Sequence, residues 1–243
     1  MPPFRNVLAV IAVLVAASTC TALGFWQLGR YREREAVNAE LRAALAAPPR
    51  PLPALRGPDP ALSAPGRWTV RGRFDETRQF LLIGRSRDGY PGVHVVTPLL
   101  REDGGPAVLV DRGFVPADDA ATAVPPAEPD TAARAVTGLV EPIVPRPGNS
   151  MWQPTPGAPM RLWSARWLVA DSVANALPYS VAAIVLRELE GEGVPAAPAR
   201  SRAAMANTSM HLSYAGQWFF FALVALVGPF FLARARRRPA GDS

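Results

Sequence analysis

The chain has 243 residues, of which 49% are hydrophobic, a formal net charge of +6 at pH 7 and one cysteine, Cys20. A single thiol excludes an intramolecular disulfide, and no group of Cys and His residues has the spacing of a zinc site. The basic side chains are all arginines spread along the chain. We therefore expect no nucleic-acid partner and attribute much of the excess charge to arginines that flank membrane segments.

The N-terminal segment predicts a transmembrane helix over residues 6–28. Residues 7–25 form an uncharged apolar run preceded by an arginine and followed by Trp26, a residue type that favours the membrane interface. A cleaved signal peptide is the alternative, but this run is longer than a usual signal core and lacks a clear cleavage site, so we favour a retained helix. The polar segment 31–47 continues the helical pattern, and Pro48 is predicted to end it.

A second uncharged stretch predicts a transmembrane helix over residues 211–233, followed by a basic tail at 234–243. Two spans must cross the bilayer in opposite directions, which puts both termini on one face. The arginines of the tail favour the cytoplasmic face, whereas three arginines just after the first span argue for the opposite orientation. Giving more weight to the short tails, we expect a multi-pass cell-membrane protein with cytoplasmic termini and residues 31–207 outside the cytoplasm.

The region between the spans is predicted to be β-rich. Prolines recur through residues 48–65, which we interpret as a linker without regular structure. Alternating apolar and polar residues, or short apolar runs bounded by turn residues, predict strands over 68–74, 79–84, 92–100, 107–114, 135–140 and 179–186. The first two strands are predicted to form one hairpin, and the next two a second hairpin around the glycines that follow Asp103.

The remaining segments complete the predicted fold. Residues 117–134 are expected to form a surface loop. A short helix that carries Trp163 and Trp167, four residues apart, is expected within 162–177. The sequence thus predicts an α+β membrane protein in which two antiparallel transmembrane helices bracket an extracytoplasmic, mainly antiparallel β domain. That domain is either a small barrel or a sandwich.

Several short motifs occur in an order and spacing that resemble the Surfeit-locus-one family, whose members act in assembly of cytochrome c oxidase. The motifs are GFWQLGR at 24–30, GRF at 72–74, RSRDG at 85–89, GVHVVTPL at 92–99, VLVDRGFVP at 108–116 and HLSYAGQWF at 211–219. The resemblance implies a two-span membrane protein that helps to deliver or insert haem a into the catalytic subunit of the oxidase. That subunit and the lipid bilayer are therefore the expected partners, and the haem a synthesis machinery is a further candidate.

The resemblance also implies a site, because a histidine at the second span is the family's suspected haem ligand. In this chain it is His211. The asparagine that often directly precedes this histidine is replaced by Met210, and Asn207 lies four residues upstream of His211.

Helical spacing adds a physical argument to that resemblance. His211, Tyr214, Ala215 and Trp218 follow the i, i+3, i+4, i+7 pattern of one helix face, where the small Ala215 is expected to leave room for a flat ligand. Neutral imidazole is a common axial ligand of haem iron, and arginine suits its carboxylates. The first span presents its own polar motif at the same predicted depth. The hypothesised haem a site therefore comprises His211, as the iron ligand, with Tyr214, Trp218, Trp26, Gln27 and Arg30.

Other interpretations stay open. His211 can be an interfacial residue satisfied by headgroups or a neighbouring helix, and the nearby polar and aromatic residues can simply join the two spans. We interpret His94 as a packed or surface residue and Asp111–Gly113 as a strand end with a local ion pair and a turn. No nucleophile–base pair, phosphate loop or metal cluster is visible, so we do not expect an enzyme. The alternative function is a permanent accessory subunit of the oxidase that never handles haem.

Overall fold

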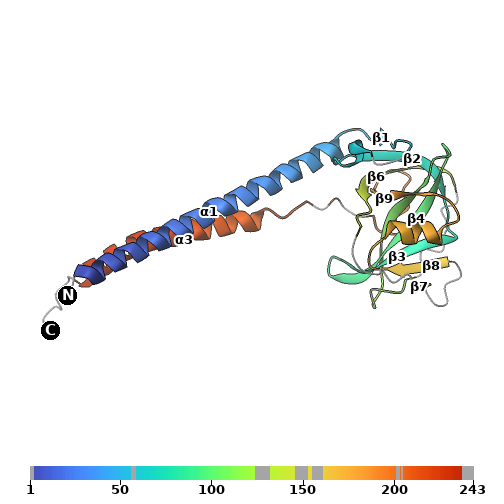
Figure 1. Ribbon diagram of the computed structural model, residues 1–243. Coiled ribbons are helices and arrows are strands. Elements are labelled where there is room, and N and C mark those ends of the chain that lie inside the picture. Colours follow the sequence, from blue (N-terminus) through green and yellow to red (C-terminus); the bar gives the residue numbers. More distant parts are fainter. Residues whose placement is uncertain are drawn as a thin grey trace. The chain divides into compact units, whose positions relative to one another are not determined.

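The structure is a computed structural model that describes residues 3–55, 59–123, 132–145, 153–154, 161–200, 203 and 205–236. Its helices are α1 (Pro3–Ala46), η1 (Pro60–Leu62, a 3-10 helix), α2 (Ala170–Ala176) and α3 (Ser209–Arg236). Its strands are β1 (Arg50–Pro51), β2 (Arg67–Phe74), β3 (Arg78–Arg87), β4 (Tyr90–Arg101), β5 (Ala107–Pro116), β6 (Arg134–Pro142), β7 (Gln153–Pro154), β8 (Arg161–Ala165) and β9 (Val181–Glu188) (Figure 1). The chain forms two compact units. A helical unit combines the chain up to Glu40 with the chain from Met205 onward, and a β unit spans Leu41–Ala204.

The helical unit is an antiparallel pair of α1 and α3. The rings of Phe25 and Phe219 meet edge to face with centroids 5.3 Å apart. Further along α1, the side chain of Asn38 donates to the carbonyl of Ala206 at 2.9 Å and accepts from its N–H at 2.8 Å. Later residues of α1 thus contact earlier residues of the C-terminal segment, so the two run in opposite directions. This confirms the predicted antiparallel arrangement (Figure 1).

Small residues line the seam between α1 and α3. Ala17 and Gly24 lie seven residues apart on α1, Ala215 and Ala222 lie seven apart on α3, and all four are buried. A seven-residue period is typical of helices that wind around each other as a coiled coil, and small side chains let membrane helices approach closely. A Cβ added at Gly24 would lie 2.6 Å from Cε1 of Phe219. Any larger residue at this position would therefore displace the Phe219 ring or separate the two helices.

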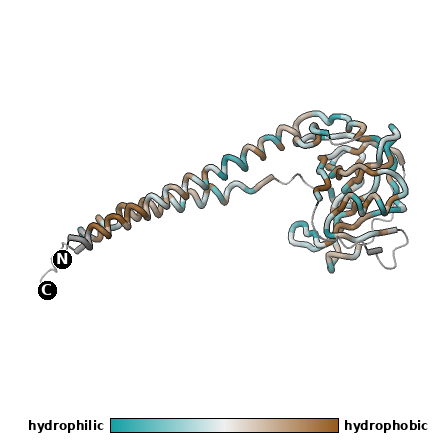
Figure 2. Tube along the Cα trace, viewed as in Figure 1, coloured by the Kyte–Doolittle hydropathy of each residue, from teal (hydrophilic) through white to brown (hydrophobic). Residues whose placement is uncertain are grey.

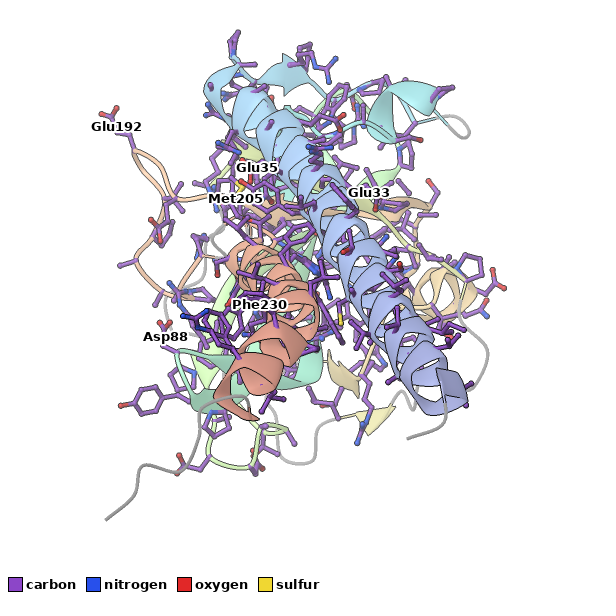
Figure 3. All side chains as sticks on the ribbon, turned by 90° about the vertical axis from the view of Figure 1, so that its left-hand side faces the viewer. Glu33, Glu35, Asp88, Glu192, Met205 and Phe230 are labelled. Atoms are coloured by element: carbon purple, nitrogen blue, oxygen red, sulfur yellow. The ribbon has the colours of Figure 1, made fainter. Side chains whose placement is uncertain are left out.

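By length and composition, α1 and α3 can each cross a membrane, as segments Val7–Ala46 and Ser209–Leu232. Figure 2 shows apolar residues along the N-terminal part of α1 and more polar residues toward its C-terminal part. Figure 3 labels Glu33 and Glu35 on that polar part and Phe230 on α3. Phe230 is 65% exposed, and many other large apolar side chains of both helices are also exposed. Outward-facing apolar side chains are what a lipid environment stabilises.

Five strands of the β unit close into a barrel in the order β2–β6–β9–β5–β4, and β2 pairs back to β4 to complete the ring. β5 and β9 run parallel, and the other pairs of the ring are antiparallel. A Cβ at Gly72 would lie 2.4 Å from the carbonyl oxygen of Leu100, so glycine permits the close approach at the closing pair. β3, β8 and β7 continue the sheet from β4 outside the ring. The β domain is therefore a barrel and not a sandwich.

Inward-facing residues at every second position fill the barrel, as the two-residue period of a strand dictates. They include Trp68, Val70 and Phe74 of β2, Val108 and Val110 of β5, Val136 of β6, and Ala182, Ile184 and Leu186 of β9.

The inward rows end in a buried ionic network. Glu188 continues the β9 row and is fully buried, with its carboxylate 2.5 Å from Nη1 of Arg134 and 2.8 Å from Nε of Arg200. Arg112 continues the β5 row and pairs with Glu76 at 2.6 Å. Burial lowers the pKa of Arg200, and the Glu188 carboxylate opposes that shift. Among the described residues, these ion pairs bring three guanidinium groups and two carboxylates together inside the protein.

The turn between β2 and β3 is held by Asp75. Its carboxylate accepts hydrogen bonds from the N–H and hydroxyl of Thr77, from Arg78 and from the hydroxyl of Tyr179, the last at 2.7 Å. Burial alone would raise the pKa of Asp75, but these hydrogen bonds and the charge of Arg78 outweigh it, so the pKa lies below its usual value of 3.8. Burial and the Asp75 carboxylate raise the pKa of Tyr179.

The strand pairing corrects one hairpin prediction. Residues 68–74 and 79–84 do lie in consecutive strands, but β2 and β3 do not pair with each other. Both instead pair with β4, which is twelve residues long and offers Leu99–Arg101 to β2 and Tyr90–Val96 to β3. The predicted hairpin of 92–100 with 107–114 is confirmed as β4–β5.

Three further predictions need correction. The predicted linker at 48–65 contains β1 and η1, and β1 pairs in parallel with β2. A short helix, α2, does lie within 162–177 as predicted, but it begins at Ala170 and carries neither Trp163 nor Trp167. Arg161–Ala165 instead form β8 against β3, and Trp163 stacks on Phe80 at 5.1 Å. Asp111–Gly113 lie inside β5 and not at a strand end. The predicted loop at 117–134 falls partly on residues 124–131, outside the described residues.

Candidate functional site

A polar contact between α1 and α3 joins His211 to Gln27, two residues of the predicted site. Nδ1 of His211 lies 2.8 Å from Oε1 of Gln27. Because an amide oxygen accepts, Nδ1 is the donor in this contact, and in the tautomer protonated at Nδ1 the other nitrogen, Nε2, keeps its lone pair. Within the described part of the chain Nε2 has no hydrogen-bond partner. The contact therefore orients the imidazole and leaves Nε2 for a ligand.

Asn207 and Met210 do not supply the partner of the His211 ring. The Asn207 side-chain oxygen accepts from the N–H of Ser209 at 3.1 Å and from its hydroxyl at 2.8 Å. Such a contact satisfies a free donor at the first turn of a helix, so Asn207 stabilises the start of α3. The side chain of Met210 is 54% exposed. The ring partner comes from α1, which local sequence around His211 could not reveal.

The residues predicted to share one face of α3 have different surroundings in the structure. Ala215 is 1% exposed and lies one helical turn from both His211 and Phe219, which contact α1. Ala215 therefore packs in the helix seam, and the expectation that it leaves room for a flat ligand is wrong. Tyr214 is 45% exposed, and the ring of Trp218 meets Phe221 edge to face at 6.0 Å. The exposed surface of α3 beside His211 therefore includes Tyr214 and not Ala215.

Two other predicted residues of α1 point elsewhere. Trp26 is 57% exposed, and Nη1 of Arg30 pairs with Glu33 at 2.7 Å. Among the described residues, no hydrogen bond or ring contact joins Trp26 or Arg30 to the His211–Gln27 pair. The Arg30–Glu33 pair is largely exposed, and such pairs contribute at most about 1 kcal/mol. Arg30 can therefore exchange Glu33 for another carboxylate at little cost.

The β unit holds a second histidine pair, at a position where the sequence predicted a packed or surface histidine. Nδ1 of His94 lies 2.8 Å from Oδ2 of Asp111, and the two side chains are 21% and 6% exposed. The other oxygen of Asp111 accepts from the N–H of Gly113 at 2.9 Å. The predicted local ion pair of Asp111 with Arg112 is absent here, because Arg112 pairs with Glu76 and Asp111 with His94.

A break in the β4–β5 register produces this second pair. The pairing shifts by one residue: Val95 pairs with Gly113 but Val96 pairs with Asp111, so Arg112 is an extra residue on β5. Gly113 has φ of 117° at this bulge, a value that favours glycine. The alternation of residues predicts the hairpin but not the bulge, so the contact between His94 and Asp111 could not be predicted from the sequence.

These features define the class of α+β membrane proteins in which two terminal helices bracket a β-barrel. Residues 14–223 match the sequence model of the SURF1 family. The chain belongs to this family, which is the Surfeit-locus-one family suggested by its motifs.

Individual relatives match different shares of the chain. An "Uncharacterized SURF1-like protein" of Mycobacterium tuberculosis is 33% identical over 111 residues, which cover 44% of this chain and 41% of that protein. A "SURF1-like protein" of Monosiga brevicollis is 30% identical over 240 residues, covering 92% of this chain and 87% of that protein. "Cytochrome oxidase assembly protein SHY1" of Saccharomyces cerevisiae is 30% identical over 94 residues, covering 38% of this chain and 24% of that protein.

Proposed function

We propose that this protein is a membrane assembly factor for a haem-copper cytochrome c oxidase and that it assists delivery or insertion of haem a into the catalytic subunit. Membership of the SURF1 family and the name of the yeast relative support a role in oxidase assembly. The role is one of holding and transfer, without catalysis. The haem a synthesis machinery is the expected upstream partner.

The His211–Gln27 pair is the observation that carries the haem part of the proposal. Haem a would be the cargo, and a neutral imidazole nitrogen is a common axial ligand for its iron. Gln27 fixes the ring through Nδ1 at 2.8 Å, as partners of ligating histidines do, and leaves Nε2 for the iron. Tyr214 and Trp218 provide aromatic surface on the same helix, and Arg30 suits a haem carboxylate.

The proposal includes a membrane orientation. We place both termini in the cytoplasm and the barrel outside it, in the cell membrane, because basic residues concentrate in the short C-terminal tail. In this orientation the His211–Gln27 pair lies near the outer end of both predicted spans. Haem a would then be met at the outer interface of the bilayer.

The test of this function is the haem a content of the oxidase in a strain that lacks the gene. We expect the deletion to lower both haem a content and oxidase activity, and the wild-type gene to restore them. His211→Ala should fail to restore them. Gln27→Leu should restore them partly, because loss of a partner of a ligating histidine lowers affinity by about 10–100-fold. Gln217→Leu, the same change at an exposed position of α3, is the matched control and should behave as wild type.

Normal haem content and activity in the deletion strain would overturn the proposal. Purification of the oxidase separates the remaining alternative. An assembly factor should associate transiently with haem-poor oxidase. An accessory subunit would instead purify in stoichiometric amounts with the mature enzyme.

A further inference from the structure

The His94–Asp111 pair lies in the wall of an open cavity of about 610 Å³ in the β unit. This volume is within the range of about 300–1,000 Å³ typical of small-molecule sites. The cavity is lined by the ends of β3, β6 and β9, by β4 and β5, and by the segment before α2. Its apolar lining includes Leu82, Phe114, Ile143, Trp167 and Val185. It is therefore suited to a ligand with a large apolar body.

The side chain of His94 lines this cavity. Its Nδ1 is held at 2.8 Å by Asp111, which is itself fixed by the N–H of Gly113. A carboxylate on Nδ1 fixes the tautomer and the ring orientation, the arrangement found behind metal-ligating histidines. Nε2 has no hydrogen-bond partner among the described residues. Nε2 is thus the ring nitrogen left to bind a metal or to accept a hydrogen bond.

The other groups around the cavity exclude a bare metal ion. A protein site for such an ion needs three or four ligands, and within the described ranges no group of three His, Cys, Asp or Glu residues could hold one. Asp111 is engaged by His94, and Glu141 is engaged by Arg187 at 2.7 Å. A metal bound by His94 must therefore bring its other ligands with it.

Cationic and donor groups in the wall favour an anionic ligand. Arg87 lines the cavity, and its guanidinium donates to the carbonyl of Arg200 at 3.0 Å. This hydrogen bond positions the guanidinium but does not neutralise its positive charge. Its nearest carboxylate is that of Asp88, at 3.8 Å and 78% exposed. Nε1 of Trp167 and Nε of Arg187 are buried without an acceptor. Unmet donors of this kind are costly, and a ligand carboxylate would supply acceptors.

We propose that this cavity is a second haem site, in which Nε2 of His94 binds the iron of a porphyrin whose carboxylates lie toward Arg87. An iron porphyrin unites the three properties the cavity requires: an apolar plane, carboxylates, and a metal that brings its own four ligands. A lipid would use the apolar wall and the arginine but leave the imidazole unused. The choice of haem as the ligand rests on the proposed function. The proposal adds a haem-binding site on the barrel to the one proposed on the helices.

The test is a spectroscopic titration of the full-length protein in detergent with ferric protoporphyrin IX. We expect two equivalents to bind to the wild-type protein, and one to His94→Ala or to His211→Ala. The double variant should bind none. Asp111→Asn should weaken the barrel site by about 10–100-fold. Added imidazole should restore the iron spectrum of His94→Ala, an effect that a purely structural role of His94 would not produce. Tyr90→Ala, at a 70% exposed position of the same strand, is the control.

Each alternative result has a separate meaning. One equivalent that His211→Ala removes and His94→Ala leaves would overturn the second site while the proposed function stands. One equivalent that only His94→Ala removes would support the barrel site and contradict the helical one. Equal binding of iron-free protoporphyrin, or binding that neither variant changes, would overturn iron ligation by His94. Hydrogen exchange of β4 and β5 in His94→Ala, if unchanged, excludes unfolding as the cause of lost binding.

Discussion

Glu188→Gln tests the buried ionic network directly, because it removes one charge and keeps the size of the side chain. Glu188 is fully buried and serves both Arg134 and Arg200, whose side chains are 16% and 2% exposed. The substitution removes the negative charge that these two guanidinium groups share in a largely buried site. Breaking a buried ion pair from one side costs about 3–5 kcal/mol. That is a large part of the roughly 5–15 kcal/mol by which a folded domain is stable.

Hydrogen exchange of the β5 and β9 amides in the full-length protein measures this cost. We expect protection of these strands to fall by a factor of roughly a hundred to a few thousand, which is the same energy expressed as an opening constant. Glu102→Gln is the matched control, because the Arg71–Glu102 pair is exposed and should change stability by less than about 1 kcal/mol. If the two variants lose equal protection, the network does not stabilise the barrel and the reasoning is refuted.

Three further predictions follow from single positions. Gly24→Leu should push α1 away from Phe219. Cysteines placed at the positions of His211 and Gln27 should then no longer be cross-linked by a short thiol reagent. Gly29→Leu is the control and should leave the cross-link intact, because a Cβ at Gly29 meets nothing within 4 Å. Gly113→Ala should destabilise the barrel by about 1–3 kcal/mol in denaturant titrations, because its φ of 117° strains any other residue; an unchanged midpoint would contradict this. Since the folded-state pKa of Asp75 lies below 3.8, its stabilising effect is complete at higher pH and is lost as the pH falls through that lower pKa. Asp75→Asn should therefore lower stability at neutral pH and weaken acid unfolding, and an unaltered pH profile would count against it.

The sequence predicts the helices and most strands because their signals are local. An uncharged run of membrane-spanning length and a two-residue alternation need no knowledge of distant residues. The choice between barrel and sandwich depends on the β2–β4 pairing, which joins Gly72–Phe74 to Leu99–Arg101 across a long stretch of chain. The same cause explains the wrong first hairpin, since β2 and β3 both pair with β4.

The candidate site was predicted in part for a similar reason. Helical spacing identifies His211 with Tyr214 and Trp218, but it cannot say which face of α3 the partner helix covers. That choice buries Ala215 and brings Gln27 to the histidine. The second histidine pair depends on a β-bulge, whose single extra residue no alternation pattern reveals.

The most direct measurement of the central claim is the absorption difference spectrum of the protein purified from cells that synthesise haem a. His94→Ala should be compared with the His94→Ala/His211→Ala double variant, so that only the helical site is read. The proposed function predicts bound haem a in the single variant and none in the double variant. Equal haem occupancy and an identical spectrum in both would contradict His211 as the ligand.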